Sequence, residues 1–403
     1  MSERYRRRGV SAQKEEVHAA VGAADPGLFP GAFCKLVPDV LGCDPAWCLA
    51  MHADGAGTKS VVAYLAWRET GDARVFEGIA QDALVMNVDD LLCVGALGPY
   101  LYSNTIGRHA RRLPGAVLQA ILRGFARLEA QYADWGMPLL ATGGETADVG
   151  DVVATLLLDV TVVTRLRRDA VIANSGVRPG DVIIALASDG QATYEARPNS
   201  GIGSNGLTSA RHDLLSRFYA ERYPETADPE TPAELVYSGP YRLEAALPGT
   251  ALSVGEALLS PTRSHAPLIK ALLEGHRELV GALVHCTGGG QTKCLRSGRG
   301  IRYVKDALFA PPPLFQAIRE CSGASWRELY QVFNMGHRLE VIGRPALLPV
   351  LEQIGRAYGV AVRQVGHCEA APGRVASAAP QGAAAQSGNR LELHTPGGME
   401  VYP

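Results

Sequence analysis

The chain has 403 residues, of which 47% are hydrophobic and 20% charged, so it can bury the core of one large domain or of two. The net charge is −2 with no long basic stripe, which argues against nucleic-acid binding, and no apolar run is long enough for a membrane span. The eight cysteines include no CxxC pair and no apolar signal segment follows Met1. We therefore expect a reduced, cytoplasmic setting without a zinc or disulfide framework.

The first predicted elements are a short helix over 13–22, a glycine-proline stretch, a buried strand over 47–54 and a helix over 58–70. The strand and the second helix are joined by the turn DGAGTK. Its glycines, Gly55 and Gly57, allow a close approach to a ligand, and the free N–H groups of the helix start attract an anion. Lys59 adds positive charge, and Asp54 can hold a metal. The alternative is an ordinary glycine turn capped by Thr58.

The next predicted helix, over 75–95, carries Asp82, Met86 and the pair Asp89–Asp90 on roughly one face. The residues around these acids are strongly apolar. Because a buried carboxylate needs a partner, the stripe indicates either a metal site or a solvated face of an amphipathic helix.

A strand over 98–107, an amphipathic helix over 114–136, a short strand ending in a second glycine-acid turn, and a long strand over 152–166 follow. The second turn contains Gly143, Gly144 and Glu145. Asp54, Asp90 and Glu145 thus each lie beside a glycine or at an element end, a pattern that suits Mg²⁺ with nucleotide phosphates. The chain lacks GxxxxGK[ST], so it has no P-loop, and it lacks a GxGxxG that opens a βαβ unit, which argues against a nicotinamide enzyme.

A domain junction near 166–178 divides the chain into 1–170 and 171–403. The second half alternates strands and helices around a polar insertion at 221–250. The segment 371–388 has the low-complexity composition of a flexible loop, and 390–402 has the alternation of a hairpin that docks on the second domain. In this half, Asn205 and the Thr262–Arg263 pair can cap helices or contact a ligand, the three glycines from Gly288 can approach phosphate, and His285 is either structural or catalytic.

Taken in order, nine segments resemble the phosphoribosylformylglycinamidine cyclo-ligase (aminoimidazole ribonucleotide synthetase) family of purine biosynthesis. They are YRRRGV, GLFPGAFCKLVP, DGAGTK, DALVMNVDDLLCVGA, GGETAD, SNGLTS, LSPTR, VHCTGGG and VFNMGH. The resemblance implies a two-domain, PurM-like α/β (α+β) fold. In that fold the N-terminal sheets of a homodimer pair into a barrel that spans the dimer, and the C-terminal sheet packs against helices.

The resemblance also implies a reaction. ATP, with Mg²⁺, binds near the acidic turns at the subunit interface and phosphorylates the amide oxygen of formylglycinamidine ribonucleotide. An amidine nitrogen then attacks that carbon, and aminoimidazole ribonucleotide, ADP and phosphate are released.

This chemistry assigns expected roles to the residues of the motifs. Asp54, Asp90 and Glu145 hold the metal; Lys59 and His285 are catalytic, His285 in proton handling. Phosphates face Gly27, Gly31, Gly55, Gly57, Thr58, Lys59, Gly143 and Gly144, while Asn205, Thr262, Gly288 and Gly289 bind the substrate.

The chain also departs from the family pattern. It has Asp89-Asp90 where Asn-Asp is common, Gly203 where many members have a histidine, Ala23 near a common lysine, and His337-Arg338 where a small or apolar pair is common. The alternatives are another ATP-dependent enzyme of the same superfamily or a non-catalytic nucleotide-binding homologue. A selenide enzyme would want a reactive cysteine near Cys34, whose apolar setting is more typical of a buried structural thiol.

Overall fold

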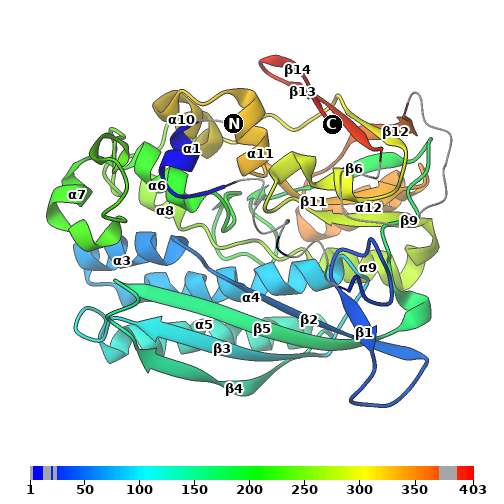
Figure 1. Cartoon of the computed structure of the whole chain (residues 1–403), viewed down its shortest axis with the longest axis horizontal. Coiled ribbons are helices and arrows are strands. Elements are labelled where there is room, and N and C mark those ends of the chain that lie inside the picture. The colour runs from blue at the N-terminus through cyan, green and yellow to red at the C-terminus, as the bar shows by residue number, and fades with distance from the viewer. Residues whose placement is uncertain (1–2, 12–19, 21–24, 372–387) are drawn as a thin grey trace.

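Two β-sheets, built from successive halves of the chain, form the framework of the protein (Figure 1). The computed structural model describes residues 3–11, 20, 25–371 and 388–403. The predicted helix over 13–22, apart from residue 20, and nearly all of the predicted flexible segment 371–388 lie outside these residues. The strands of the first sheet fall within 36–167 and those of the larger second sheet within 182–402.

The first sheet has five strands in the order β1-β2-β5-β3-β4, of which only β3 and β4 are parallel neighbours. The strands are β1 (Leu36–Pro38), β2 (Trp47–Gly55), β3 (Tyr100–Arg108), β4 (Leu139–Asp148) and β5 (Leu156–Arg167). The helices of this half are α3 (Lys59–Thr70), α4 (Glu77–Leu92) and α5 (Gly115–Asp134). These bounds confirm the predicted strands at β2, β3 and β5 and the predicted helices at α3, α4 and α5.

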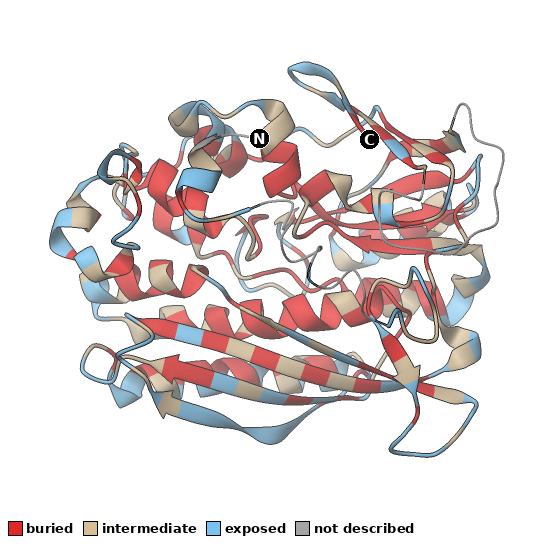
Figure 2. Cartoon of the chain, viewed as in Figure 1, coloured by how far each residue is buried: buried red, intermediate tan, exposed pale blue. Residues whose placement is uncertain are grey.

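Alternation along the central strands gives the first sheet two different faces. In β5 the side chains of Leu158, Val160 and Val162 are buried, whereas Leu157 on the other face is exposed. Figure 2 shows that α4 is buried along most of its length while β4, at the edge of the sheet, is largely exposed. The first sheet therefore has one face covered by helices and one face open.

Strand β4 corrects one sequence expectation. The segment Gly143–Glu145 was expected to be a turn, but β4 continues through it. The pairing register between β3 and β4 shifts at this point, between Tyr102 and Asn104, and Gly143 adopts a φ of 102°. The two glycines thus form an irregularity within a strand, which glycine tolerates because it has no Cβ.

The second sheet has seven strands in the order β14-β13-β10-β12-β6-β11-β9. They are β6 (Val182–Ala187), β9 (Val280–His285), β10 (Ile301–Lys305), β11 (His337–Gly343), β12 (Val362–Ala370), β13 (Arg390–Thr395) and β14 (Gly398–Tyr402), and a separate short pair comprises β7 (Asp189–Gly190) and β8 (Asn199–Ser200). The predicted terminal hairpin is confirmed, because β13 pairs antiparallel with β14 and parallel with β10.

The helices of the second half are α6 (Leu207–Leu214), α7 (Phe218–Arg222), α8 (Val254–Leu258), α9 (Ala266–His276), α10 (Pro313–Ser322), α11 (Trp326–Val332) and α12 (Leu347–Tyr358). Short 3-10 helices lie at Ala73–Phe76, Arg168–Ala170, Pro224–Thr226, Ala233–Leu235, Arg277–Leu279 and Gly290–Arg296.

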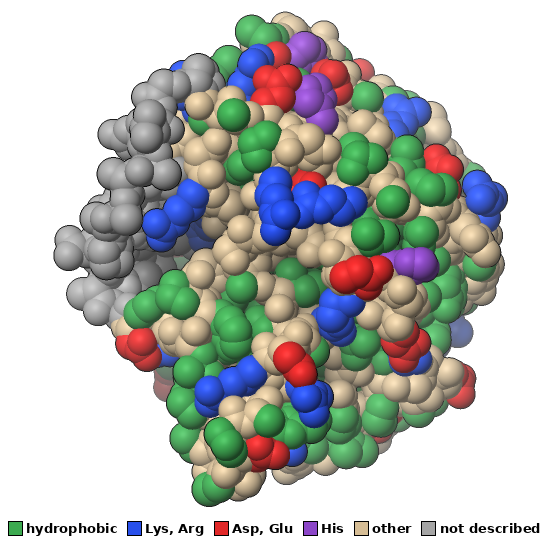
Figure 3. Space-filling view, turned by 90° about the vertical axis from the view of Figure 1, so that its right-hand side faces the viewer, with side chains coloured by type: hydrophobic (Ala, Val, Ile, Leu, Met, Phe, Trp, Pro, Cys, Tyr) green, Lys and Arg blue, Asp and Glu red, His purple; other side chains and the backbone are tan. Residues whose placement is uncertain are grey.

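Among the described residues, no helix combines the length and the apolar character needed to cross a membrane. Figure 3 shows one side of the surface, on which acidic, basic and apolar side chains are interspersed.

Two segments tie the halves of the chain together. The N-terminal helix α1 (Glu3–Arg7) packs on the second half, where the buried Arg8 pairs with Asp213 at 2.8 Å. The insertion at 221–250 lies against α3, with the Tyr223 hydroxyl donating to Glu69 at 2.5 Å and Arg242 donating to Glu69 at 3.1 Å. The insertion is therefore an ordered part of the contact between the two halves.

Candidate functional site

The acidic stripe of α4 lies where the two halves of the chain meet, and each of its acids has a partner. Asp82 pairs with Lys59 at 2.8 Å, Asp89 pairs with Arg338 at 2.7 Å, and Asp90 pairs with His285 at 2.5 Å. Asp82 and Asp89 are fully buried. The stripe is therefore not a solvated face; protein cations and hydrogen-bond donors compensate these carboxylates.

Lys59, expected to contact phosphate, is buried in this structure. Its ammonium donates to Asp82 Oδ1 at 2.8 Å, to the Gly203 carbonyl at 3.1 Å and to the Ser260 carbonyl at 2.5 Å. An ammonium has three N–H donors, and all three have protein acceptors here. The arrangement favours a positioning role in which Lys59 ties the start of α3 to α4 and to two loops of the second half.

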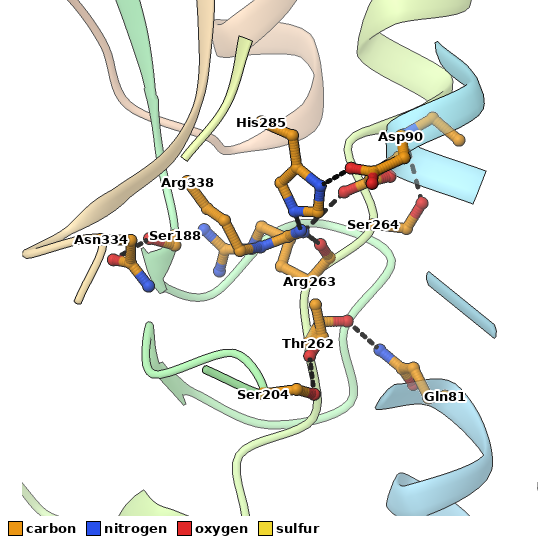
Figure 4. A network of polar contacts seen from close by, with 12 residues as sticks. Gln81, Asp90, Ser188, Ser204, Thr262, Arg263, Ser264, His285, Asn334 and Arg338 are labelled. Carbon is orange, nitrogen blue, oxygen red and sulfur yellow. Dashed lines mark hydrogen bonds and ion pairs between the residues drawn. The ribbon is translucent and has the colours of Figure 1, made fainter. Parts of the chain in front are cut away.

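Thr262 completes this buried group (Figure 4). Its backbone N–H and its hydroxyl both donate to Asp82 Oδ1, at 2.8 and 2.6 Å, and its carbonyl accepts from Gln81 at 2.9 Å. The Ser204 hydroxyl lies 3.1 Å from the Thr262 hydroxyl. The predicted substrate residue Thr262 is thus fully buried, and Ser204, which contacts it, is half-buried.

A second group of polar residues links Asp89 and Asp90 of α4 to two residues of the second sheet, Arg338 on β11 and His285 on β9 (Figure 4). Arg338 donates to Asp89 and to His285 Nε2, while His285 Nδ1 lies 2.5 Å from Asp90 Oδ1. Because a guanidinium only donates, Nε2 of His285 must accept, so Nδ1 carries the proton and donates to Asp90. Both ring nitrogens of His285 are therefore engaged, and its geometry favours orienting Asp90 over direct proton transfer.

His52 belongs to the site, although it was not singled out from the sequence. It lies two residues before Asp54 on β2, so the strand alternation places both side chains on the same face. Its Nε2 lies 3.0 Å from Asp90 Oδ2 and its Nδ1 lies 2.9 Å from Asn87 Oδ1. Burial opposes the charged imidazolium, but the hydrogen bond and charge of Asp90 outweigh it and raise the pKa of His52.

Asp54, at the end of β2, lies beside other carboxylates. Its own Oδ1 accepts from the Gly55 N–H at 2.8 Å, and burial together with the charge of Asp90 raises its pKa. On the opposite face Asp159 lies so close to Gly55 that a Cβ there would be 1.9 Å from its Oδ1. Burial and the charge of Asp54 raise the pKa of Asp159 as well. Asp54 and Asp90, two oxygen donors that repel each other on the helix side of the sheet, fit a hard divalent cation such as Mg²⁺.

Two helix N-termini meet beside these carboxylates. The Thr58 hydroxyl, at the N-cap of α3, lies 2.9 Å from the Thr208 hydroxyl in the first turn of α6. Neither N-cap residue, Thr58 or Gly206, caps its helix through a side chain. Asn205 is half-buried in the turn before α6, and Gly57, with a φ of 56°, is exposed. Free N–H groups from both halves of the chain are thus close together, as anion binding requires.

The structure does not bring Glu145 to Asp54 and Asp90 within one chain. Register places Gly55, Asp159, Thr105 and Glu145 in one row across β2, β5, β3 and β4. Three strand spacings separate the ends of this row, about 14 Å, because neighbouring strands lie about 4.8 Å apart. Glu145 is also exposed on the open face, whereas Asp54 faces the helices.

The predicted glycines divide into two groups. Gly27 and Gly144 are required by packing, since a Cβ would lie 2.5 Å from the Leu36 carbonyl and 2.6 Å from the Asn104 carbonyl, respectively. Gly288 and Gly289 have positive φ angles and lie in a half-buried loop after β9, with open space at Gly288, and Gly31 also has a positive φ. The loop at Gly288 and Gly289 follows a strand that ends in a site residue, His285.

Three of the departures from the family pattern meet in space. Asp89 and Arg338 form the buried ion pair described above, and a Cβ at Gly203 would lie 3.3 Å from Arg338 Cδ. His337 instead pairs with the buried Glu340 at 3.0 Å. The three substitutions are thus mutually compatible, while Ala23 lies outside the described residues.

The chain is similar in sequence to phosphoribosylformylglycinamidine cyclo-ligases. Residues 37–166 match the family described as AIR synthase related protein, N-terminal domain. The phosphoribosylformylglycinamidine cyclo-ligase of Methanothermobacter thermautotrophicus is 32% identical over 292 residues, which cover 72% of this chain and 71% of that protein. The enzyme of the same name from Pyrococcus furiosus is 31% identical over 292 residues, covering 72% of this chain and 70% of the relative.

Solved structures share the fold at low identity. Hydrogenase maturation protein HypE in complex with ATP superposes with a TM-score of 0.52 at 16% identity, covering 88% of this chain and 84% of HypE. AaThiL complexed with AMPPCP and TMP gives a TM-score of 0.51 at 14% identity, covering 92% of this chain and 96% of that one.

Proposed function

The chain belongs to the phosphoribosylformylglycinamidine cyclo-ligase family, and we propose that it converts formylglycinamidine ribonucleotide and ATP to aminoimidazole ribonucleotide, ADP and phosphate. The observation that carries this proposal is the meeting of the α3 and α6 N-termini, marked by the Thr58–Thr208 contact, beside Asp54 and Asp90. The reaction needs a binding site for the phosphates of ATP next to carboxylates that can hold Mg²⁺. The two helix N-termini that would bind phosphate come from the two halves of the chain.

The chemistry begins with the amide oxygen of the substrate, which is a poor leaving group until it is phosphorylated. The γ-phosphoryl group of ATP passes to that oxygen, and ADP leaves. The amidine nitrogen then forms a bond to the same carbon and loses a proton, and the C–O bond breaks to release phosphate. Phosphoryl transfer depends mainly on positioning and charge neutralisation, which the backbone N–H groups of the two helix starts can supply.

Mg²⁺ fits the oxygen donors of Asp54 and Asp90, which would hold it, and when bound it neutralises phosphate charge. His285 holds one oxygen of Asp90 and His52 lies 3.0 Å from the other, so the carboxylate is oriented from both sides. Lys59 and Thr262 keep the loops at Gly203 and Ser260 against α4. These residues act by positioning the groups that contact nucleotide and substrate.

We also propose that the protein is a cytoplasmic homodimer. Its open sheet face carries the exposed acid Glu145 in the same register row as Asp159. A second copy covering this face would place its own acids beside Asp159 and Glu145.

The test is to incubate the purified chain with ATP, Mg²⁺ and formylglycinamidine ribonucleotide and to measure aminoimidazole ribonucleotide and ADP together. Equal amounts of both products are expected. ADP formed without the ribonucleotide product would indicate another ATP-dependent phosphate transfer, and nucleotide binding without either product would indicate a non-catalytic homologue.

A matched pair of variants links the assay to the site. Asp90→Asn should lower turnover by about 10²-fold or more, since it removes charge where the phosphoryl group is transferred. Asp151→Asn makes the same chemical change at an exposed loop position and should leave turnover unchanged. Equal effects of the two variants would argue against this site.

A further inference from the structure

Three potential metal ligands of different chemistry meet at the edge of the proposed site. Cys34 lies before β1, His52 lies on β2 and Asp90 lies on α4. One ligand atom from each side chain lies within 4.8 Å of the other two. The Cys34 thiol donates to the Asp90 carbonyl at 3.2 Å, and His52 Nε2 lies 3.0 Å from Asp90 Oδ2. Sulfur, nitrogen and oxygen donors therefore converge from three separate segments.

Asn87 orients the imidazole of His52 so that its Nε2 can bind a metal. The amide nitrogen of Asn87 donates to the carbonyls of Asp54, Ala83 and Val160 at 3.0, 2.9 and 3.0 Å, which fixes the orientation of its amide. Asn87 Oδ1 must then accept from His52 Nδ1, 2.9 Å away. With the proton on Nδ1, the lone pair of neutral His52 is on Nε2, the atom that faces Asp90. A hydrogen bond from the second ring nitrogen is the usual support of a metal-bound histidine.

Asp90 is held in the same way. His285 Nδ1 donates to Asp90 Oδ1, so the second oxygen, Oδ2, faces His52. Arg338 in turn fixes the orientation of His285 through its Nε2. Both His52 and Asp90 thus have supporting partners that leave one ligand atom each pointing toward the cluster.

We propose that Cys34 Sγ, His52 Nε2 and Asp90 Oδ2 form a binding site for a soft divalent transition-metal ion, with Zn²⁺ the best fit. On binding, the Cys34 S–H bond breaks, His52 Nε2 gives up the proton that it shares with Asp90, and both protons pass to solvent, while sulfur, nitrogen and oxygen each form a bond to the metal. A thiolate and an imidazole select Zn²⁺ over Mg²⁺, which prefers oxygen ligands. Thiolate and carboxylate together balance the charge of the ion, and a fourth position remains for water or a phosphate oxygen.

Two of the three ligand side chains are open to solvent. The side chains of His52 and Asp90 are 23% and 13% exposed, respectively, whereas Cys34 is buried. The charge of Asp54 acts on His52 and adds to the negative potential there. If the proposed function holds, Zn²⁺ withdraws Asp90 from the magnesium centre, so occupancy of this site stops turnover.

The binding test uses Co²⁺ as a spectroscopic probe on the full-length, chelator-stripped chain without substrate. We expect one equivalent of Co²⁺ to give a thiolate-to-cobalt charge-transfer band that Zn²⁺ abolishes by displacement. Cys34→Ser should lose this band, and His52→Gln should weaken Co²⁺ binding by about 10-fold or more. Cys43→Ser is the matched control, because Cys43 is an exposed free cysteine outside the cluster. Absence of the band, or its persistence in Cys34→Ser, overturns the proposal.

A separate activity measurement tests the consequence. Zn²⁺ should inhibit the wild-type and Cys43→Ser chains at least about 10-fold more strongly than Cys34→Ser, at fixed Mg²⁺ and ATP. Equal inhibition of all three would remove the link between the site and turnover. Because the cobalt band is read without substrate, a chain that binds Co²⁺ but makes no aminoimidazole ribonucleotide would contradict the proposed function and leave the metal site standing.

Discussion

Asp89 and Arg338 show how a single buried pair shapes the centre of this protein. Both side chains are almost fully closed off from solvent, and the guanidinium also contacts His285 and the Arg263 carbonyl. Burial raises the pKa of Asp89, and the charge of Arg338 opposes that rise. Removing one partner leaves the other charge buried without compensation, which is far more costly than removing both.

We therefore predict that Arg338→Met destabilises the chain by roughly 3–5 kcal/mol and that the double variant Asp89→Asn/Arg338→Met recovers most of this loss. Urea unfolding of the two single variants and the double variant measures the coupling. Arg74→Met, which breaks the exposed pair of Arg74 with Asp72, should leave the unfolding midpoint unchanged. Additive losses in the double variant would show that the two charges do not depend on each other.

His212 gives a prediction about pH. It is buried, its Nδ1 accepts from the Tyr237 N–H at 3.1 Å, and burial together with the charges of Arg211 and Arg8 lowers its pKa to about 2. The folded chain therefore keeps this imidazole neutral, while the unfolded chain protonates it below a pH of about 6.5. Because the unfolded state binds the extra proton, the free energy of unfolding falls as the pH drops below that value.

The contribution of His212 should be about 1.4 kcal/mol per pH unit between roughly pH 6 and 4. His212→Asn keeps an acceptor for Tyr237 and removes the titration, so its free energy of unfolding should depend less steeply on pH than that of the wild type. Urea unfolding at several pH values measures the two slopes. Identical slopes for His212→Asn and wild type would contradict this prediction.

At the scale of elements, the terminal hairpin is a structural strand pair and not an appendage. Leu391, Leu393 and Tyr402 are buried, and β13 extends the second sheet by parallel pairing with β10. Each buried side chain of this size contributes about 1.5–3 kcal/mol relative to exposure. Its loss would also leave β10 as an uncovered edge.

We predict that a chain truncated after Asn389 melts at a clearly lower temperature than the full chain. The double variant Met399→Ala/Val401→Ala keeps the hairpin but trims two exposed side chains, and its melting temperature should change little. Thermal unfolding followed by circular dichroism compares the three proteins. An unchanged melting temperature for the truncated chain would mean that the hairpin contributes nothing to the stability of the fold.

For the whole molecule, the open face of the first sheet is the main surface without a cover in the described chain. The resemblance implies that the N-terminal sheets of a homodimer pair, and within one chain the apolar strand β5 lies between β2 and β3. An apolar row lies across the open face. Register aligns Met51, Val163, Leu101 and Leu140 across four strands, and Met51, Leu101 and Leu140 are 66, 45 and 50% exposed.

We predict that this row is the centre of a homodimer interface. Leu101→Glu, which places a charge in the middle of the row, should convert a dimer to a monomer in sedimentation velocity at micromolar concentration. Leu122→Glu makes the same change at an exposed position on α5 and should leave the dimer intact. A wild-type chain that sediments as a stable monomer would contradict the prediction.

The sequence by itself determined the elements and the family. Periodicity predicted β2, α3, α4, β3, α5, β5 and the terminal hairpin, because local alternation and helical spacing follow which face of each element is buried. The ordered motifs were sufficient to indicate the cyclo-ligase family. The strand through Gly143 and Gly144 was missed, because glycine occurs both in turns and in strand irregularities.

Only the tertiary structure decided what the site residues contact. Sequence spacing could not show that Lys59 is buried against Asp82, that Arg338 and not a metal compensates Asp89, or that Glu145 lies three strands from Asp54. It also gave no reason to combine Cys34, His52 and Asp90, which are distant in the chain. A charged side chain has the same sequence pattern whether its partner is water, a metal or a buried cation, and that partner is set by packing between segments that are remote in sequence.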